Sequence, residues 1–298
     1  MENKTKAFTL TIKSSLDIIF RHKIIMLVTF AVITFFALIA IKFKTPIYDA
    51  NVKMLIRGQS VTAAETYIPI GAYGIHYTQA EIVKSYPVLK RAAIALNLQN
   101  RPFDYEKNYC SQLKRMYIEY MAEKAEKNFK KYSPEQQQQI RLDGAIEDLR
   151  RRLTVTTLPG TDIFVINVTA LSANEAIETA NIISRSYTIF DQLQQLAEIS
   201  LRYGESHPTV VQLKDNIKYA TDNLSGKPLS DIEAIGTASV KVIEQAISTG
   251  YPLGRPRKMI LLAALLIAGF CGFGIAFAYG YLDKTTDVPY ILKSKIEL

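Results

Sequence analysis

Two long uncharged runs, one near each end of the chain, dominate the hydrophobic pattern. Ile24–Ile41 is 18 residues long and Met259–Leu282 is 24 residues long, and neither contains a charge. A helix of 18 residues is about 27 Å long, close to the hydrocarbon thickness of a bilayer. Neither run has the polar face that a helix on a soluble core would show. Both runs are therefore predicted to be transmembrane helices, over residues 24–42 and 258–282.

A cleaved signal peptide is the competing interpretation of the first run. Such a peptide would have a shorter apolar region and a small-residue cleavage site. Here the apolar region is long, and Lys42, Phe43 and Lys44 follow it directly. We therefore favour an uncleaved membrane anchor.

The flanking charges bear on the orientation of the two helices. The cations before the first run are Lys4, Lys6, Lys13, Arg21 and Lys23, which favour a cytoplasmic N-terminus. Arg255, Arg257 and Lys258 precede the second run and favour the opposite orientation. The positive-inside rule loses force across a loop of more than 200 residues. We expect residues 1–23 and 283–298 in the cytoplasm and 43–257 outside it.

The second run carries small residues at a spacing of four. They are Ala264, Ala268, Gly272, Ala276 and Gly280. Residues at this spacing share one helix face, and small side chains let another helix backbone approach closely. Gly and Ala are also common in membrane helices generally. We favour a helix-packing face over that alternative.

Between the two runs, the pattern changes several times between the period of a strand and that of a helix. Alternation or β-rich composition predicts strands at Tyr48–Ile56, Leu153–Thr157, Ile163–Thr169 and Ala238–Ala246. Helices are predicted over Thr78–Leu98, interrupted at Pro87, over Asp104–Lys131, from Ser133 to Arg152, from Ser172 to about Tyr203, and after His207 to about Leu224. Loops or turns are predicted at Gly58–Gly74, Pro159-Gly160 and Gly226–Pro228. The order predicts an α+β domain.

Local signals set several of these helix ends. Ser133 followed by Pro134 indicates an N-cap with proline in the first turn, and Ser172 with Glu175 matches a capping box. The triplet Arg150–Arg152 suits the C-terminal end of a helix dipole, which we prefer over a ligand site. His207 before Pro208 indicates a break in the long helix.

Composition and motifs point away from catalysis. The chain has a formal net charge of +8. This charge would suit binding to nucleic acid, anionic lipid or an acidic polymer, but ordinary surface charge that keeps a protein soluble explains it equally well. Its two cysteines, Cys110 and Cys271, are not expected to pair, and its three histidines follow no metal-ligand spacing. The sequence shows no phosphate-binding glycine loop, dinucleotide fingerprint or G-x-S-x-G motif. We therefore predict a protein without catalytic activity, cofactor or metal.

Several stretches, in order along the chain, resemble the Wzz-type chain-length determinants, also called polysaccharide co-polymerases. The stretches are Pro46–Ala50, Thr78–Leu98, Leu153–Tyr187 with Ala180, Asn181 and Tyr187, Tyr203–Ile217, and Val242–Ala246 leading to Pro252 and Pro256. The family's proline-rich element often has three prolines, whereas Pro252 and Pro256 alone match it here. Some relatives continue into a tyrosine kinase, and the sequence after the second apolar run carries no nucleotide motif.

The resemblance implies a non-cytoplasmic α/β domain with a long projecting helix, ring-shaped homo-oligomers, and control of polymer length without a catalytic residue. It implies as partners the membrane, a polysaccharide polymerase or exporter and the glycan chain, and no nucleic acid. A tyrosine kinase would be a separate polypeptide, or absent. Two alternatives stay open: an inner-membrane component of a capsule export machine, and a two-helix sensor. The short tail counts against the sensor.

Overall fold

The computed structural model describes residues 23–56, 79–159, 161–227, 240–254 and 257–284. The fold is mixed helix and sheet, with an apolar helix near each end of the chain. By their contacts the residues divide into two compact units. Unit 1 takes in the residues up to Lys44 and from Gly254 on, and unit 2 is Thr45–Leu253.

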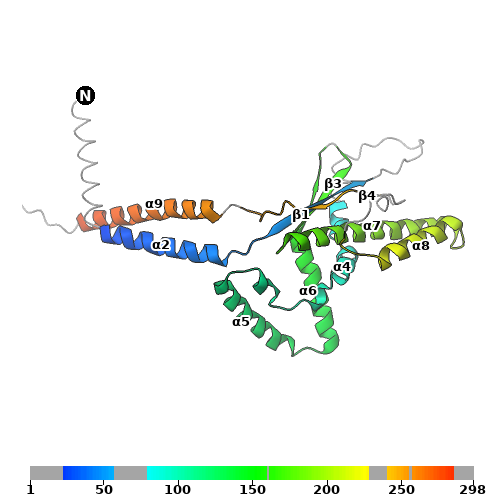
Figure 1. The fold of residues 1–298 in the computed structure, drawn as a ribbon, viewed down its shortest axis with the longest axis horizontal. Helices are drawn as coiled ribbons and strands as arrows, with labels where there is room; N and C mark the ends of the chain where they lie inside the picture. Colours follow the sequence, from blue (N-terminus) through cyan, green and yellow to red (C-terminus); the bar gives the residue numbers. More distant parts are fainter. Residues whose placement is uncertain (1–22, 57–78, 160, 228–239, 255–256, 285–298) are drawn as a thin grey trace, which may run out of the picture. The chain divides into compact units, whose positions relative to one another are not determined.

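Unit 1 is a pair of helices, α2 (Lys23–Phe43) and α9 (Arg257–Lys284), which pack against each other (Figure 1). Both are long and apolar enough to cross a membrane, over Lys23–Phe43 and Lys258–Tyr279. Most of their large apolar side chains are exposed, for example Ile24 at 71% and Phe270 at 78%. Exposed apolar surface of this extent is what a lipid-facing helix presents.

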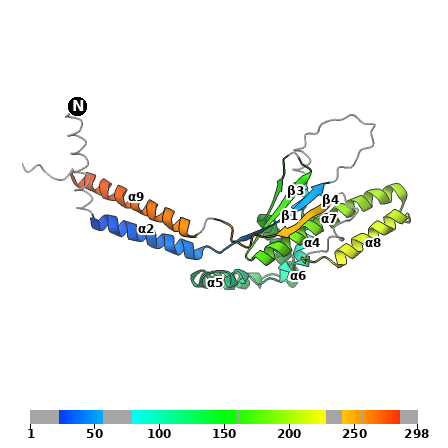
Figure 2. The ribbon, with the colours of Figure 1, turned by 45° about the horizontal axis from the view of Figure 1, so that its top comes forward.

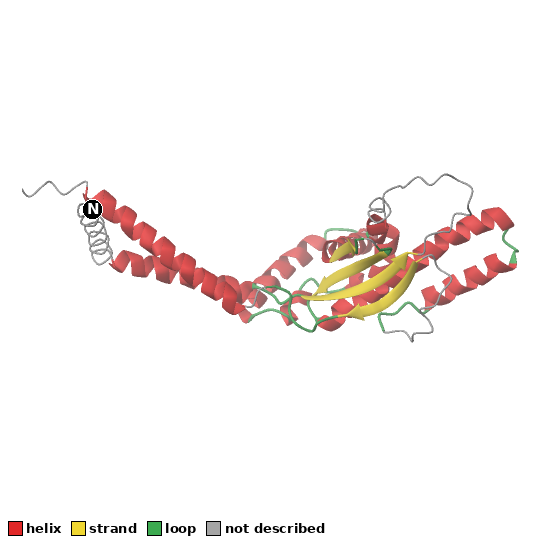
Figure 3. Ribbon diagram, turned by 90° about the horizontal axis from the view of Figure 1, so that it is seen from above, coloured by secondary structure: helices red, strands yellow, loops and turns green. Residues whose placement is uncertain are grey.

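Unit 2 is built on a four-stranded sheet in the order β2-β3-β1-β4. Its strands are β1 (Tyr48–Ile56), β2 (Leu153–Thr157), β3 (Ile163–Ala170) and β4 (Val240–Ile247), with every neighbouring pair antiparallel. Figure 3 shows them as one sheet with helices along it. The predicted strands are confirmed, apart from the part of the last one before Val240, which lies outside the described residues.

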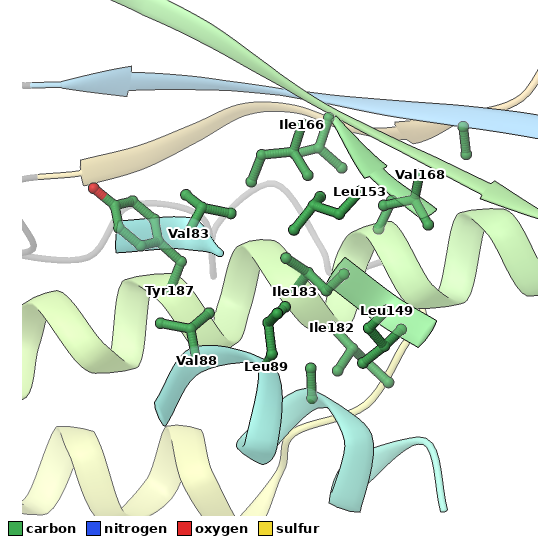
Figure 4. Packing of buried hydrophobic residues seen from close by; sticks show 14 of the residues in the cluster. Val83, Val88, Leu89, Leu149, Leu153, Ile166, Val168, Ile182, Ile183 and Tyr187 are labelled. Atoms are coloured by element: carbon green, nitrogen blue, oxygen red, sulfur yellow. The ribbon is translucent and has the colours of Figure 1, made fainter. Parts of the chain in front are cut away.

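The core forms where the alternating side chains of the sheet meet two helices. Every second residue of β1 and β3 points inward, including Val52, Met54, Phe164 and Ile166. These side chains pack against α7 (Ala173–Tyr203), α4 (Tyr86–Ala95) packs on α7 within the same core, and α6 (Pro134–Arg152) packs on α4 (Figure 4). Strand side chains alternate between the two faces, so one face of the sheet supplies the core.

The long helix α7 continues past the sheet and folds back through α8 (Pro208–Asp222), as Figure 2 shows. The predicted end of the long helix at about Tyr203 is confirmed, and so is the break before the next helix, which begins at Pro208. Gly204 follows α7 with φ +82°, a backbone conformation that suits glycine. His207 instead caps α8, because its Nδ1 accepts the backbone N–H of Thr209 at 3.3 Å.

One predicted helix is partly wrong. Asp104–Lys131 does not form a continuous helix: a short 3-10 helix, η2 (Tyr105–Asn108), precedes α5 (Gln112–Phe129). The Tyr105 and Tyr109 hydroxyls lie 3.0 Å apart, and Tyr105 also bonds to α7, so these contacts hold a turn where helical spacing alone predicted a helix. Another 3-10 helix, η1 (Leu98–Asn100), follows α4. The loop predicted at Gly58–Gly74, together with Gly160 and Pro228, lies outside the described residues.

Candidate functional site

Gly272, at the centre of the predicted packing face of α9, lies against α2 of the same chain. Ala268 and Ala276 have no exposed surface, and Gly272 is also buried. A Cβ on Gly272 would lie 3.2 Å from the carbonyl oxygen of Met26 and from Thr29 Oγ1. Ala264 is half-buried, and the surroundings of Gly280 lie outside the described residues. Close approach of α2 therefore depends on the missing side chain at Gly272.

The predicted proline-rich element is described only in part. Pro252 lies in unit 2, and Pro256 lies outside the described residues. Beside Pro252, the backbone N–H of Leu253 donates to the carbonyl oxygen of Ile47 at 2.5 Å. This bond joins the two chain segments by which unit 2 leads to α2 and α9.

Two residues of α7 singled out by the sequence, Asn181 and Tyr187, are buried in the core. Asn181 is 2% exposed, donates from Nδ2 to the Gly226 carbonyl at 3.1 Å and accepts the Ala246 N–H at 2.9 Å. Tyr187 is 2% exposed, packs edge-to-face on Phe164 and hydrogen-bonds to Gln79. Burial raises the pKa of the Tyr187 hydroxyl. Asn181 thus fastens β4 and the turn after α8 to the long helix.

Sequence reasoning missed a polar cluster at the start of α7. Glu175 is the third residue of the helix, and its backbone N–H bonds to Ser172 as predicted, at 3.2 Å. In a capping box the Glu175 carboxylate would accept the backbone N–H of Ser172, but here it binds other partners. Oε1 lies 2.8 Å from Arg101 Nη2 and 3.3 Å from Arg152 Nη1, and Oε2 accepts from the Tyr105 hydroxyl at 3.1 Å.

The cluster is shielded from water. The Glu175 side chain is only 12% exposed, and the Arg101 guanidinium lies over the Tyr105 ring, 3.9 Å from its centre. Burial raises the pKa of Tyr105 well above 10, and the Tyr109 hydroxyl and the Glu175 charge act in the same direction. Arg152 also pairs with Asp148 at 2.6 Å. Through Arg101, Tyr105 and Arg152, the Glu175 carboxylate therefore holds the segment from Arg101 to η2 and the end of α6 against the start of α7.

A second polar group lies beside this cluster and involves the first residue of unit 2. Thr45 Oγ1 donates to Glu106 Oε1 at 2.7 Å and accepts from Lys114 Nζ at 2.6 Å, and Lys114 is ion-paired with Glu106. Burial favours a higher pKa for Glu106, but the hydrogen bonds from Lys114 and Thr45 and the charges of Lys114 and Arg152 outweigh it. The pKa of Glu106 is therefore below its usual value.

The two polar groups border a cleft of about 370 Å³. Its lining residues are Ile47, Arg101, Pro102, Phe103, Tyr105, Glu106, Arg152, Thr169, Ala170 and Leu171. The cleft combines guanidinium donors with an aromatic ring, a set able to bind a polar or anionic ring-shaped group. Both carboxylates of the two groups, Glu106 and Glu175, are held by cations.

The arginine triplet and the two cysteines noted in the sequence have the following places in the structure. Arg150 and Arg151 pair with Glu147, as expected for a helix end, whereas Arg152 belongs to the polar cluster. The thiol of Cys110 is half-buried and Cys271 is exposed on α9. Among the residues that the structure describes, no group of three His, Cys, Asp or Glu side chains is arranged to hold a metal ion.

Compared with known proteins, the chain matches no family model and no curated protein. Among solved structures it is similar to a full-length bacterial polysaccharide co-polymerase. That match covers 91% of this chain and 98% of the other, with 10% identical residues and a TM-score of 0.37. A TM-score of this size describes loosely similar backbones, and membership of a family does not follow from it.

Proposed function

We propose that the chain is a polysaccharide co-polymerase: a membrane-anchored scaffold that regulates the length of a surface polysaccharide or exopolysaccharide made by a membrane polymerase. The sequence stretches that resemble the Wzz-type proteins support this function, in particular the run from Leu153 to Tyr187. The core positions of Asn181 and Tyr187 support a shared structural role for that motif.

One observation carries the proposal: the two ends of unit 2 meet, and each continues into an apolar helix. The backbone N–H of Leu253 bonds to the carbonyl of Ile47. Ile47 follows Phe43, the last residue of α2, by four residues, and Leu253 precedes Arg257, the first residue of α9, by four residues. Both helices are long enough to cross a bilayer. A domain fastened at one place to two such helices suits a protein that acts at the membrane surface on a membrane partner.

The chemistry of the cleft supports binding more than bond-making. Glu175 is held between two guanidinium groups, and Glu106 is held ionised by Lys114 and Thr45. A general acid or base needs a pKa near the working pH, and the lowered pKa of Glu106 lies farther from it. We assign the cleft to contact with the glycan chain, with Arg101 and Arg152 as donors to its oxygens.

The proposal also includes a location in the inner membrane with both termini in the cytoplasm. It further includes assembly into a homo-oligomer, with the polymerase and a separate tyrosine kinase as partners. Reporter fusions test the topology. Fusions after residue 150 should be active only outside the cytoplasm, and fusions after residues 5 or 295 only inside. The opposite pattern would contradict the arrangement on which the function depends.

A deletion strain tests the function against its alternative, an inner-membrane component of a capsule exporter. Without a co-polymerase the polymer should still be made and still reach the cell surface, with an altered distribution of lengths. Total surface polymer and intracellular precursor are measured in the same cultures. Loss of surface polymer with precursor accumulating inside the cell would favour the exporter.

A further inference from the structure

Helix α5 exposes a stripe of large apolar side chains. The exposed fractions are 53% for Leu113, 71% for Met116, 65% for Tyr120 and 44% for Met121. Their spacing of three, four and one residues places them on one side of the helix, here called the outer face. An exposed apolar face of this kind marks a surface that contacts a partner or a membrane.

The opposite side of α5 already packs against unit 2. Ile118 is 8% exposed, and the Phe129 ring meets Phe103 edge-to-face with 5.4 Å between centres. The Arg141 guanidinium lies 4.8 Å from the centre of each of these rings. Helix α5 thus carries apolar side chains on two opposite sides, whereas a surface helix with water outside is polar on its outer side. We therefore expect the outer face to contact a partner or a membrane instead of water.

The first turn of α5 is hydrogen-bonded to Thr45, the first residue of unit 2 after helix α2. Lys114 Nζ donates to Thr45 Oγ1 at 2.6 Å, and Thr45 is 7% exposed. Thr45 follows Phe43, the last residue of α2, by two residues. Two residues of chain reach at most about 7 Å. If α2 spans the bilayer, as the proposed function requires, Thr45 lies in or close to the interfacial layer, which is about 5–8 Å deep, and the start of α5 is held beside Thr45 by the Lys114 side chain.

The charges near the outer face suit anionic headgroups. Residues 112–131 carry six lysines or arginines and three glutamates. Lys124 and Lys127 follow Met116 and Tyr120 on the same side, one to two turns farther along α5. An interfacial helix combines apolar and aromatic residues facing the acyl boundary with cations that reach the headgroups.

We propose that the outer face of α5 binds the surface of the lipid bilayer, with Leu113, Met116 and Tyr120 inserted at the level of the headgroups. This contact rests on the proposed function, because it needs α2 to span the membrane. It gives unit 2 a third attachment to the membrane besides its two chain connections, and thereby fixes the side of the domain that faces the lipid.

The test uses the full chain in nanodiscs of phosphatidylethanolamine and phosphatidylglycerol. In a background with Cys110→Ser and Cys271→Ser, a single spin label is placed by Met116→Cys or Tyr120→Cys on the outer face. Glu126→Cys, on the other side of α5, is the matched control, and Phe35→Cys in α2 reports the membrane helix itself. Power saturation compares collisions with oxygen, which partitions into lipid, with collisions with a water-soluble nickel complex.

Labels at 116 and 120 should favour oxygen at least several-fold more than the label at 126, and should lie at a shallower depth than the label at 35. If the labels at 116 and 126 are equally accessible to nickel while the label at 35 is in lipid, the lipid contact of α5 is wrong, but the assignment of α2 as a membrane helix is supported. If the label at 35 is also in water, the proposed function fails as well. Spin–spin broadening at 116 that disappears on mixing with unlabelled chain would show a second copy on the outer face, and would overturn the lipid contact.

Discussion

Arg101 Nη2 lies 2.8 Å from Glu175 Oε1, although one residue follows a 3-10 helix and the other opens the long helix α7. This ion pair is the centre of the polar cluster. Arg152 and Tyr105 bind the same carboxylate, so one side chain joins three separate segments of unit 2.

Removing the charge of Glu175 should destabilise unit 2. Glu175→Gln leaves Arg101 and Arg152 close together with their shared carboxylate gone, and breaking a mostly buried pair costs about 3 kcal/mol. In a domain of this size that corresponds to a fall in melting temperature of about 6–12 °C. Circular dichroism of the full chain in detergent measures it. The control Glu119→Gln removes an exposed partner of Arg115 and should shift the melting temperature by about 2 °C at most. Equal effects of the two variants would contradict the shielded cluster.

Glu106 should make stability depend on acid pH. Its folded-state pKa is below the ordinary value of about 4.5, so its contribution is present above that value and is lost as pH falls through the folded-state pKa. The gap in melting temperature between wild type and Glu106→Gln should be constant from pH 7 to about 5.5 and should narrow below about 4.5. Glu135→Gln, at an exposed position, is the control. A gap that widens in acid would contradict the assignment.

Asn181→Leu should destabilise the domain although it adds apolar volume to a buried position. The substitution leaves the Ala246 N–H and the Gly226 carbonyl, both partly buried, without their partner, at a cost of about 1 kcal/mol for each group. Asn167→Ala removes an amide that donates to Thr156 near the surface, and should cost less than about 1 kcal/mol. Chemical unfolding of both variants gives the comparison. A Leu variant as stable as wild type would mean that water replaces both bonds.

Gly272→Leu should separate α2 from α9, because a Cβ at this position already meets Met26 and Thr29 at 3.2 Å. Gly274→Leu is the matched control, since a Cβ there has nothing within 4 Å. Thermal stability and assembly size in mild detergent, by light scattering, are compared for the two variants. We expect only the variant at 272 to lose stability or change assembly. Identical behaviour would mean that the spacing of small residues reflects ordinary membrane composition.

The sequence predicted the sheet well because its signal is local. Inward side chains alternate along Tyr48–Ile56 and Ile163–Ala170, and a period of two requires no knowledge of the partner strand. Helix starts at Ser133 and Ser172 were also correct, because a cap and its N–H donors lie within three residues.

The candidate site could not be predicted in the same way. Glu175 was identified as a capping residue, but its cationic partners come from two other segments, and nothing in the sequence pairs them with it. The turn at Tyr105–Tyr109 overrode helical spacing for the same reason: its hydrogen bond to Glu175 is a tertiary contact. Local pattern specifies elements, whereas a polar cluster depends on how those elements meet.

The central claim, control of polymer length, is tested most directly by the length profile of the extracted glycan on a gel. The profile is compared between a deletion strain carrying the full chain on a plasmid and the same strain with an empty plasmid. The account predicts that lengths cluster around one modal value when the chain is present and spread without that mode when it is absent. The same profile in both strains, with the chain present in the membrane, would contradict the account.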